Sequence, residues 1–153
     1  VLSMIAKNLK GVMPEAGELP DNDKSLLKAA ADLPSILRPL MDSQTFHEAL
    51  ERIWVVIRAS NGYVDRQAPW ALRKTDPARM STVLYVLAET IRRIAIVTQP
   101  FMPDASTALL DQVGAAADAR DFAAIAGAPL TPGDVLPKPA GVFPRFQGDS
   151  EDV

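Results

Sequence analysis

Two long stretches with helical apolar periodicity, separated by one proline break, constrain the fold of this chain most strongly. In SQTFHEALERIWVVIRASNGYVDRQA, residues 43–68, apolar side chains recur every three or four residues, and Pro69 ends the pattern. PARMSTVLYVLAETIRRIAIVT, residues 77–98, repeats the pattern, and Asp76 before it suits a helix N-cap. Ser43 suits the N-cap of the helix predicted within residues 43–68 in the same way. Each stretch predicts an amphipathic helix with one broad inward face. In the stretch 43–68 this predicted face holds Phe46, Ala49, Leu50, Ile53, Trp54, Ile57 and Val64.

The remaining segments also favour helices and turns. VLSMIAKNLKG predicts a first helix, which we expect to be truncated because no capping residue precedes its apolar pattern. Residues 24–41 are helical in pattern but contain Pro34 and Pro39, which predict a kink or two shorter helices. Shorter helices are expected at 104–113 and 119–126. With no alternating strand pattern, the predicted fold class is an all-α helical bundle.

Residues 128–153 are rich in proline and predict an extended tail that docks on a surface rather than packing a core. We therefore expect a helical domain over residues 1–127 followed by this tail. The total of 153 residues suits one such domain.

Composition excludes several kinds of site. The chain has no cysteine and one histidine, so thiolate or multi-histidine metal sites are excluded and no metal is expected. A net charge of −3 argues against a large basic surface but allows a local basic patch. Charged residues interrupt every apolar run before the ~18 residues of a membrane span. We expect a cytoplasmic protein without a membrane partner.

Enzymatic chemistry also lacks support in the residues. His47 has no nucleophile or metal set with it, so we interpret it as structural or exposed. The acidic pairs Asp21/Asp23, Asp118/Asp121 and Glu151/Asp152 lie near expected helix starts or in the tail, where capping and solvation explain them. No glycine-rich phosphate-binding motif is present.

The segment NGYVDRQAPWALRK, residues 61–74, is the main candidate for a binding site. Trp70 directly follows Pro69, which fixes the backbone where one helix ends. Residue type alone slightly favours an indole packed under the break, whereas an exposed indole could stack on an unpaired base. The nearby cations could then hold phosphates, or they could only solvate the helices. These cations are Arg58, Arg66, Arg73 and Lys74. Trp54, on the apolar face, is predicted to lie in the core.

The same segment resembles the anticodon-binding helical domain of class I aminoacyl-tRNA synthetases, and its QAPW sequence is similar to that of the methionyl enzymes. IAKNLKG, FHEALERIW, IAIVTQPFMPDAS and LPKPAGVFPR extend the resemblance, in order, over residues 1 to about 146. It implies a helical bundle that recognises the CAU anticodon of methionine tRNA. By this resemblance Trp70 stacks on the first anticodon base, a cytidine, and Pro69 shapes its pocket. Asn61, Tyr63 and Asp65 match the motif and are expected to organise the helix end, while Arg66, Arg73 and Lys74 could contact phosphate.

The resemblance also implies partners. The parent enzyme would use ATP to attach methionine to its tRNA, but the HIGH and KMSKS catalytic motifs are absent from this chain. We therefore expect no adenylate formation and no cofactor in this chain, with a separate catalytic domain as partner. The Pro-rich end would run toward that domain through Val142, Phe143 and Phe146. The absence of an appended tRNA-binding barrel implies a monomer.

Two alternatives remain at this point. The chain could be the equivalent domain of an isoleucyl, valyl or cysteinyl enzyme. It could instead be a helical protein-interaction domain in which Trp70 is buried.

Overall fold

The computed structural model describes residues 1–143, and the fold of these residues is all-α, which confirms the predicted fold class. Within this part of the chain the only β feature is an isolated antiparallel bridge between Val12 and Val135. No helix in it is both long enough and apolar enough to cross a membrane. The helices are α1 (Leu2–Asn8), α2 (Asp21–Ala31), α3 (Leu33–Asp42), α4 (Phe46–Gln67), α5 (Pro69–Thr75), α6 (Pro77–Thr98), α7 (Pro103–Gln112) and α8 (Ala124–Gly127).

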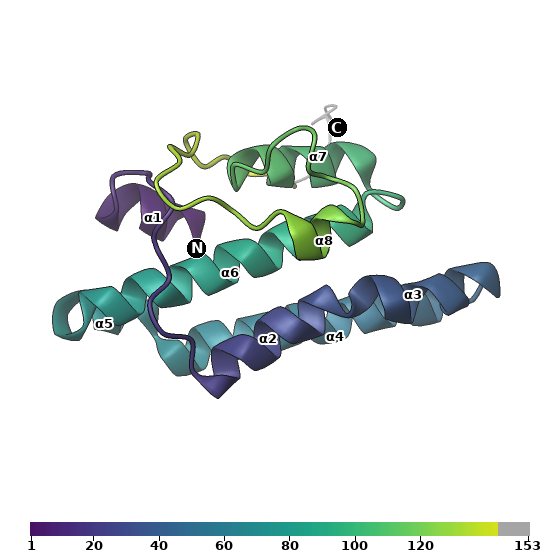
Figure 1. Ribbon diagram of the computed structural model, residues 1–153, viewed down its shortest axis with the longest axis horizontal. Coiled ribbons are helices and arrows are strands. Elements are labelled where there is room, and N and C mark those ends of the chain that lie inside the picture. The colour runs from purple at the N-terminus through teal and green to yellow at the C-terminus, as the bar shows by residue number, and fades with distance from the viewer. Residues whose placement is uncertain (144–153) are drawn as a thin grey trace, which may run out of the picture.

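Helix α6 is the central element of the bundle. It runs between a layer of α2, α3 and α4 and a second layer that contains α1, α7 and α8 (Figure 1). It contacts α1, α2, α4, α5 and α7 directly. Because helices cover it on several sides, apolar residues are buried around much of its circumference, including Val83, Leu84, Ala88 and Ile96. The predicted start and end of this helix, Pro77 and Thr98, are confirmed.

The second predicted helix is divided in two next to Pro34, as expected. Helix α2 ends at Ala31, and Pro34 lies in the first turn of α3, where its missing N–H would have no helical partner. Pro39 lies inside α3. The prediction that Ser43 caps α4 is wrong: Thr45 occupies that position, and the Ser43 hydroxyl donates to the carbonyl oxygen of Pro39 at 2.9 Å instead. The helix expected at 119–126 is also shorter, covering only Ala124–Gly127.

Trp54 is not a core residue, so that prediction is wrong. Its exposed fraction is 53%, whereas its neighbour Ile53 is buried. Successive residues of a helix are rotated by about 100°, and α4 is buried through the side that holds Ala49, Ile53 and Val56. Trp54 lies at the margin of the predicted face, which no helix among residues 1–143 covers fully.

Asp23 also differs from its interpretation as a capping or solvated residue. It is completely buried, and Pro20 occupies the N-cap position of α2. Its carboxylate instead pairs with Arg79 of α6, with 2.5 Å between Arg79 Nη1 and Asp23 Oδ2. A buried carboxylate requires such a partner because burial removes its hydration.

The start of the Pro-rich tail packs more deeply than predicted. Leu130 is buried in the hydrophobic core, and its backbone N–H donates to Glu89 at 3.1 Å. The following residues pair with the loop after α1 through bonds such as Met13 N–H to the Asp134 carbonyl at 2.8 Å. The interpretation of the tail as packing no core is therefore wrong at Leu130. Phe143 is exposed, and Phe146 lies outside the described residues.

Candidate nucleic-acid interface

The break between α4 and α5 has a defined backbone geometry. Pro69 disfavours the right-handed helical conformation of Ala68, and α4 ends immediately before that residue. Ala68 instead adopts the left-handed region, with φ 43° and ψ 59°. Its N–H donates to Val64 at the end of α4, and its carbonyl accepts from Ala71 at the start of α5. One residue therefore ends the first helix and begins the second.

This geometry places Pro69 and Trp70 in different environments. Pro69 is buried, whereas Trp70 has an exposed fraction of 56%. A Trp side chain carries a large aromatic surface, and exposing it in water gives up the free energy that burial would provide. The exposure of Trp70 therefore argues against the second alternative, a helical protein-interaction domain in which Trp70 is buried.

Several cations lie close to Trp70 in the sequence. Arg66, Arg73 and Lys74 are all exposed. Among residues 1–143, no carboxylate lies within ion-pair distance of these three side chains. Arg58, by contrast, is paired with Glu51 on the same helix. The predicted phosphate contacts thus remain available, while Arg58 is engaged elsewhere.

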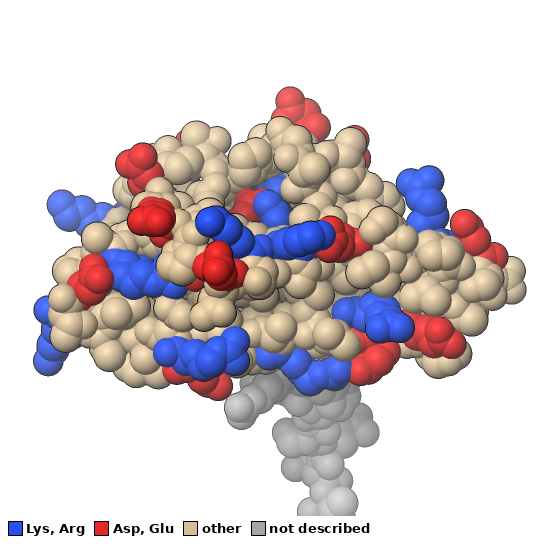
Figure 2. Space-filling model, turned by 60° about the horizontal axis from the view of Figure 1, so that its bottom comes forward, with Lys and Arg blue, Asp and Glu red and all other residues tan. Residues whose placement is uncertain are grey.

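The charges over one face are mixed. Figure 2 shows Lys and Arg side chains interspersed with Asp and Glu, without a continuous basic field. This distribution agrees with the net charge of −3. Any nucleic acid bound here would depend on a few local cations rather than on the field of the whole surface.

The three residues expected to organise the end of α4 have different surroundings. Asn61 and Asp65 are exposed. Tyr63 is buried, with an exposed fraction of 1%, and its hydroxyl donates to Asp23 Oδ1 at 2.9 Å. Tyr63 therefore ties α4 to α2 directly, while Asn61 and Asp65 make no such connection.

Sequence reasoning missed the residues that complete this connection. Arg79 Nη2 donates to Asp23 Oδ1 at 2.7 Å and to Gln67 Oε1 at 2.8 Å, and it lies 3.4 Å from the Tyr63 hydroxyl. We call Asp23, Tyr63, Gln67 and Arg79 the Asp23 network. It joins α2, α4 and α6 directly beneath the break. The available signal was Tyr63 itself, since a buried tyrosine hydroxyl needs a hydrogen-bond partner.

The network alters the proton affinity of two of its members. Burial raises the pKa of Tyr63 above its ordinary value of 10.0, and the bond to the Asp23 carboxylate raises it further. Hydrogen bonding to Asp23 likewise raises the pKa of Arg79. Both shifts favour the protonated forms, in which Tyr63 and Arg79 donate to Asp23.

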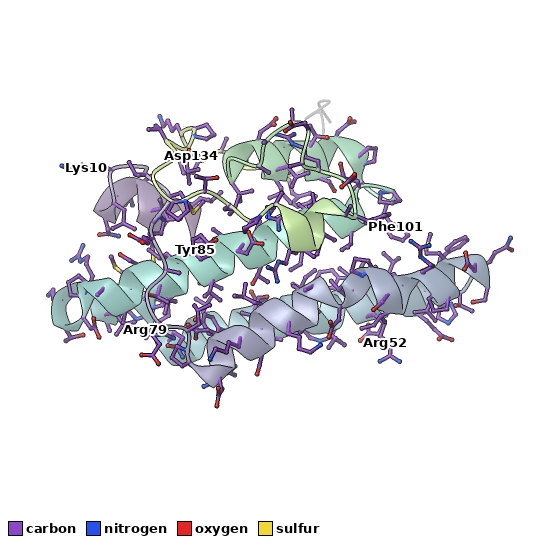
Figure 3. All side chains as sticks on the ribbon, viewed as in Figure 1. Lys10, Arg52, Arg79, Tyr85, Phe101 and Asp134 are labelled. Carbon is purple, nitrogen blue, oxygen red and sulfur yellow. The ribbon has the colours of Figure 1, made fainter. Side chains whose placement is uncertain are left out.

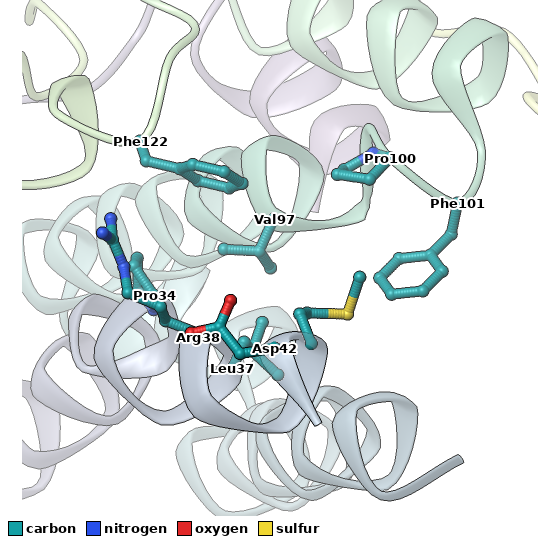
Figure 4. A pocket seen from close by; sticks show the side chains of 9 residues that line it. Pro34, Leu37, Arg38, Asp42, Val97, Pro100, Phe101 and Phe122 are labelled. Carbon is teal, nitrogen blue, oxygen red and sulfur yellow. The ribbon is translucent and has the colours of Figure 1, made fainter. Parts of the chain in front are cut away.

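An apolar pocket lies elsewhere in this part of the molecule. A cavity of about 360 Å³ opens between α3, the end of α6 with the turn after it, and the loop before α8 (Figure 4). Phe101 and Phe122 form its aromatic walls, and Arg38 and Asp42 lie at its edge. It contains none of the predicted site residues and lies toward the opposite end of α6 from α5 (Figures 1 and 3). Residues 1–143 also contain no cluster of three or more His, Asp or Glu side chains that could hold a metal ion.

Fold and surface together define a helical domain in which an exposed aromatic side chain is accompanied by cations that have no carboxylate partner among residues 1–143, an arrangement suited to unpaired bases. Comparison with known proteins makes the class specific. The sequence profile of the family described as the anticodon binding domain of methionyl tRNA ligase matches residues 13–152. The chain belongs to this family.

Individual relatives agree with the family. The methionine–tRNA ligase of Brucella melitensis is 49% identical over 145 residues, which are 95% of this chain and 28% of the relative. That of Mycobacterium tuberculosis is 47% identical over 150 residues, 95% of this chain and 29% of the relative. The crystal structure of the apo form of M. tuberculosis methionyl-tRNA synthetase superimposes with a TM-score of 0.91 over 95% of this chain and 30% of that one. The chain thus spans less than a third of the length of these relatives.

Proposed function

We propose that this chain recognises the CAU anticodon of methionine tRNA and that Trp70 stacks on its first base, a cytidine. The observation that carries the proposal is the exposed indole of Trp70, held at a fixed break beside cations without carboxylate partners. An aromatic side chain that stacks on an unpaired base contributes about 1 to 3 kcal/mol. Pro69, which is buried at the same turn, shapes the surface on which the cytidine is bound.

The cations then act on the phosphates that flank the stacked base. Arg73 and Lys74 lie one turn after Trp70 on α5, and Arg66 precedes the break on α4. Residues three and four apart share a helix face, so Arg73 and Lys74 accompany the indole on one side of α5. Phosphate contacts of this kind fix orientation and carry no base preference. The contact with the first anticodon base itself therefore falls to Trp70, and stacking supplies affinity rather than a choice between bases.

The chemical step belongs to another part of the full-length enzyme. We assign the ATP-dependent attachment of methionine to a catalytic domain outside this chain, because the HIGH and KMSKS motifs are absent here. The parent would work in the cytoplasm as a monomer and would use this domain to select its tRNA. This chain contributes binding free energy and no reacting group.

A titration of the full-length synthetase with anticodon stem-loops tests the proposal. One stem-loop carries CAU, and a second differs only in the first anticodon base, replaced by an abasic site. We expect the abasic stem-loop to bind about 5- to 150-fold more weakly, as loss of the stacking contribution requires. Equal affinity for both would contradict anticodon reading and would favour an interaction domain that binds RNA only through its phosphates.

A further inference from the structure

The helix that carries Trp70 has little to hold it in place by itself. Helix α5 is seven residues long, and Pro69 is its buried residue, with Leu72 packed partly against the core. Helices of this length are unstable in isolation. The orientation of α5 must therefore be set by its packing on α6 and by the residues at its two ends.

A single residue of α6 contacts both of those ends. The Arg79 side chain donates to Oε1 of Gln67, the last residue of α4, at 2.8 Å. The Arg79 backbone N–H donates to Oδ1 of Asp76, the residue between α5 and α6, at 2.9 Å. The segment 68–76, which contains Trp70, is thus held at its start and at its end by Arg79.

The guanidinium of Arg79 is itself fixed by a buried charge. Asp23 is completely buried and accepts from two nitrogens of Arg79, at 2.5 and 2.7 Å. A paired guanidinium and carboxylate define both distance and plane, so the group that reaches Gln67 has little rotational freedom. Figure 3 shows Arg79 close to the α5 end of the bundle.

We propose that Arg79 is a positioning residue for anticodon binding, which holds the segment 68–76 so that Trp70 is presented in one orientation. Only the effect on RNA binding rests on the proposed function; the positioning of segment 68–76 by Arg79 does not. The ion pair with Asp23 supports the fold in general, whereas the bond to Gln67 ties the last residue of α4, directly before the break, to α6. Gln67 therefore separates positioning from general stability.

The test uses Gln67→Met in the full-length protein, which removes the acceptor for Arg79 and leaves the Asp23 ion pair intact. Gln99→Met is the matched control: Gln99 is also half-buried, and its side chain donates to the Arg120 carbonyl at 2.7 Å, at the other end of α6. Hydrogen exchange followed by mass spectrometry compares the amides of residues 70–76 with those of residues 83–96. Stem-loop titrations with CAU and with the abasic first position complete the set.

We expect Gln67→Met to raise exchange at residues 70–76 about fivefold, the factor for one lost hydrogen bond, without changing residues 83–96. Affinity for the CAU stem-loop should fall by a similar factor, with no change for the abasic stem-loop. Gln99→Met should do neither. Unchanged exchange at 70–76, an equal rise in both segments, or faster exchange with unaltered CAU affinity would each overturn the proposal. If the wild type binds both stem-loops equally, the proposed function fails, and the exchange data still decide whether Arg79 holds α5.

Discussion

The buried carboxylate of Asp23 offers the sharpest test of how the fold supports the Trp70 break. In Asp23→Ala, the Tyr63 hydroxyl loses its acceptor, and the Arg79 guanidinium, 19% exposed, loses its partner. An unsatisfied buried hydroxyl costs about 1 to 3 kcal/mol, and breaking a fully buried ion pair costs about 3 to 5 kcal/mol. Because Arg79 retains Gln67 and reaches some water, the lower end applies, and we expect the free energy of unfolding to fall by about 3 kcal/mol.

Urea unfolding at 25 °C and pH 7, followed by circular dichroism at 222 nm, measures this loss. Asp21→Ala is the control, since Asp21 lies in the same first turn of α2 but is exposed. Its removal loses only an interaction with the helix dipole, so the control should fall by less than about 1 kcal/mol. If Asp23→Ala were no more destabilising than Asp21→Ala, the Asp23 network would not stabilise the helices that meet at the break.

Three further predictions concern other parts of the domain. Ile53→Ala should lower the free energy of unfolding by about 3 kcal/mol, and Trp54→Ala by only about 1 kcal/mol because Trp54 is half exposed. Equal losses in urea unfolding would contradict the exposed position of Trp54. The pKa values of Tyr63 and Tyr85 are raised on folding, so above pH 10 the unfolded state loses protons that the folded state keeps. The free energy of unfolding should therefore fall as the pH rises, by up to about 1.4 kcal/mol per pH unit for each tyrosine. Urea midpoints from pH 9 to 11 would detect this, and Tyr63→Phe should reduce the slope, whereas an unaltered slope would argue against Tyr63 as a source. Three phosphate contacts from Arg66, Arg73 and Lys74 predict that log K for stem-loop binding falls with log salt concentration with a slope of about −2, and a slope near zero would exclude them.

Local sequence signals predicted the long helices and the break between them. Helix α6 begins and ends at the expected residues, because Asp76, Pro77 and the apolar pattern act within a few residues of each other. The break at Pro69 is local for the same reason, since a proline restricts the residue immediately before it. Features of this kind require no knowledge of the rest of the fold.

Features that depend on distant segments were not predictable in this way. Trp54 lies at the edge of a broad apolar face, and only the arrangement of the neighbouring helices determines whether such an edge is covered. Asp23 and Arg79 are 56 residues apart in the sequence. Each lies in the first turn of its own helix, where the local sequence gives no sign of a buried ion pair. For Trp70, residue type alone slightly favoured burial. The family resemblance favoured an exposed ring, which is the environment observed.

A double-mutant cycle tests whether Trp70 stacks on the first anticodon base, as we propose. The full-length protein and its Trp70→Ala variant are each titrated with the CAU stem-loop and with the stem-loop that is abasic at the first position. If the indole and the base contact each other, either change should weaken binding by about 1 to 3 kcal/mol and the second change should add little, which gives a coupling free energy of similar size. Two losses that simply add, with a coupling free energy near zero, would contradict the stacking assignment.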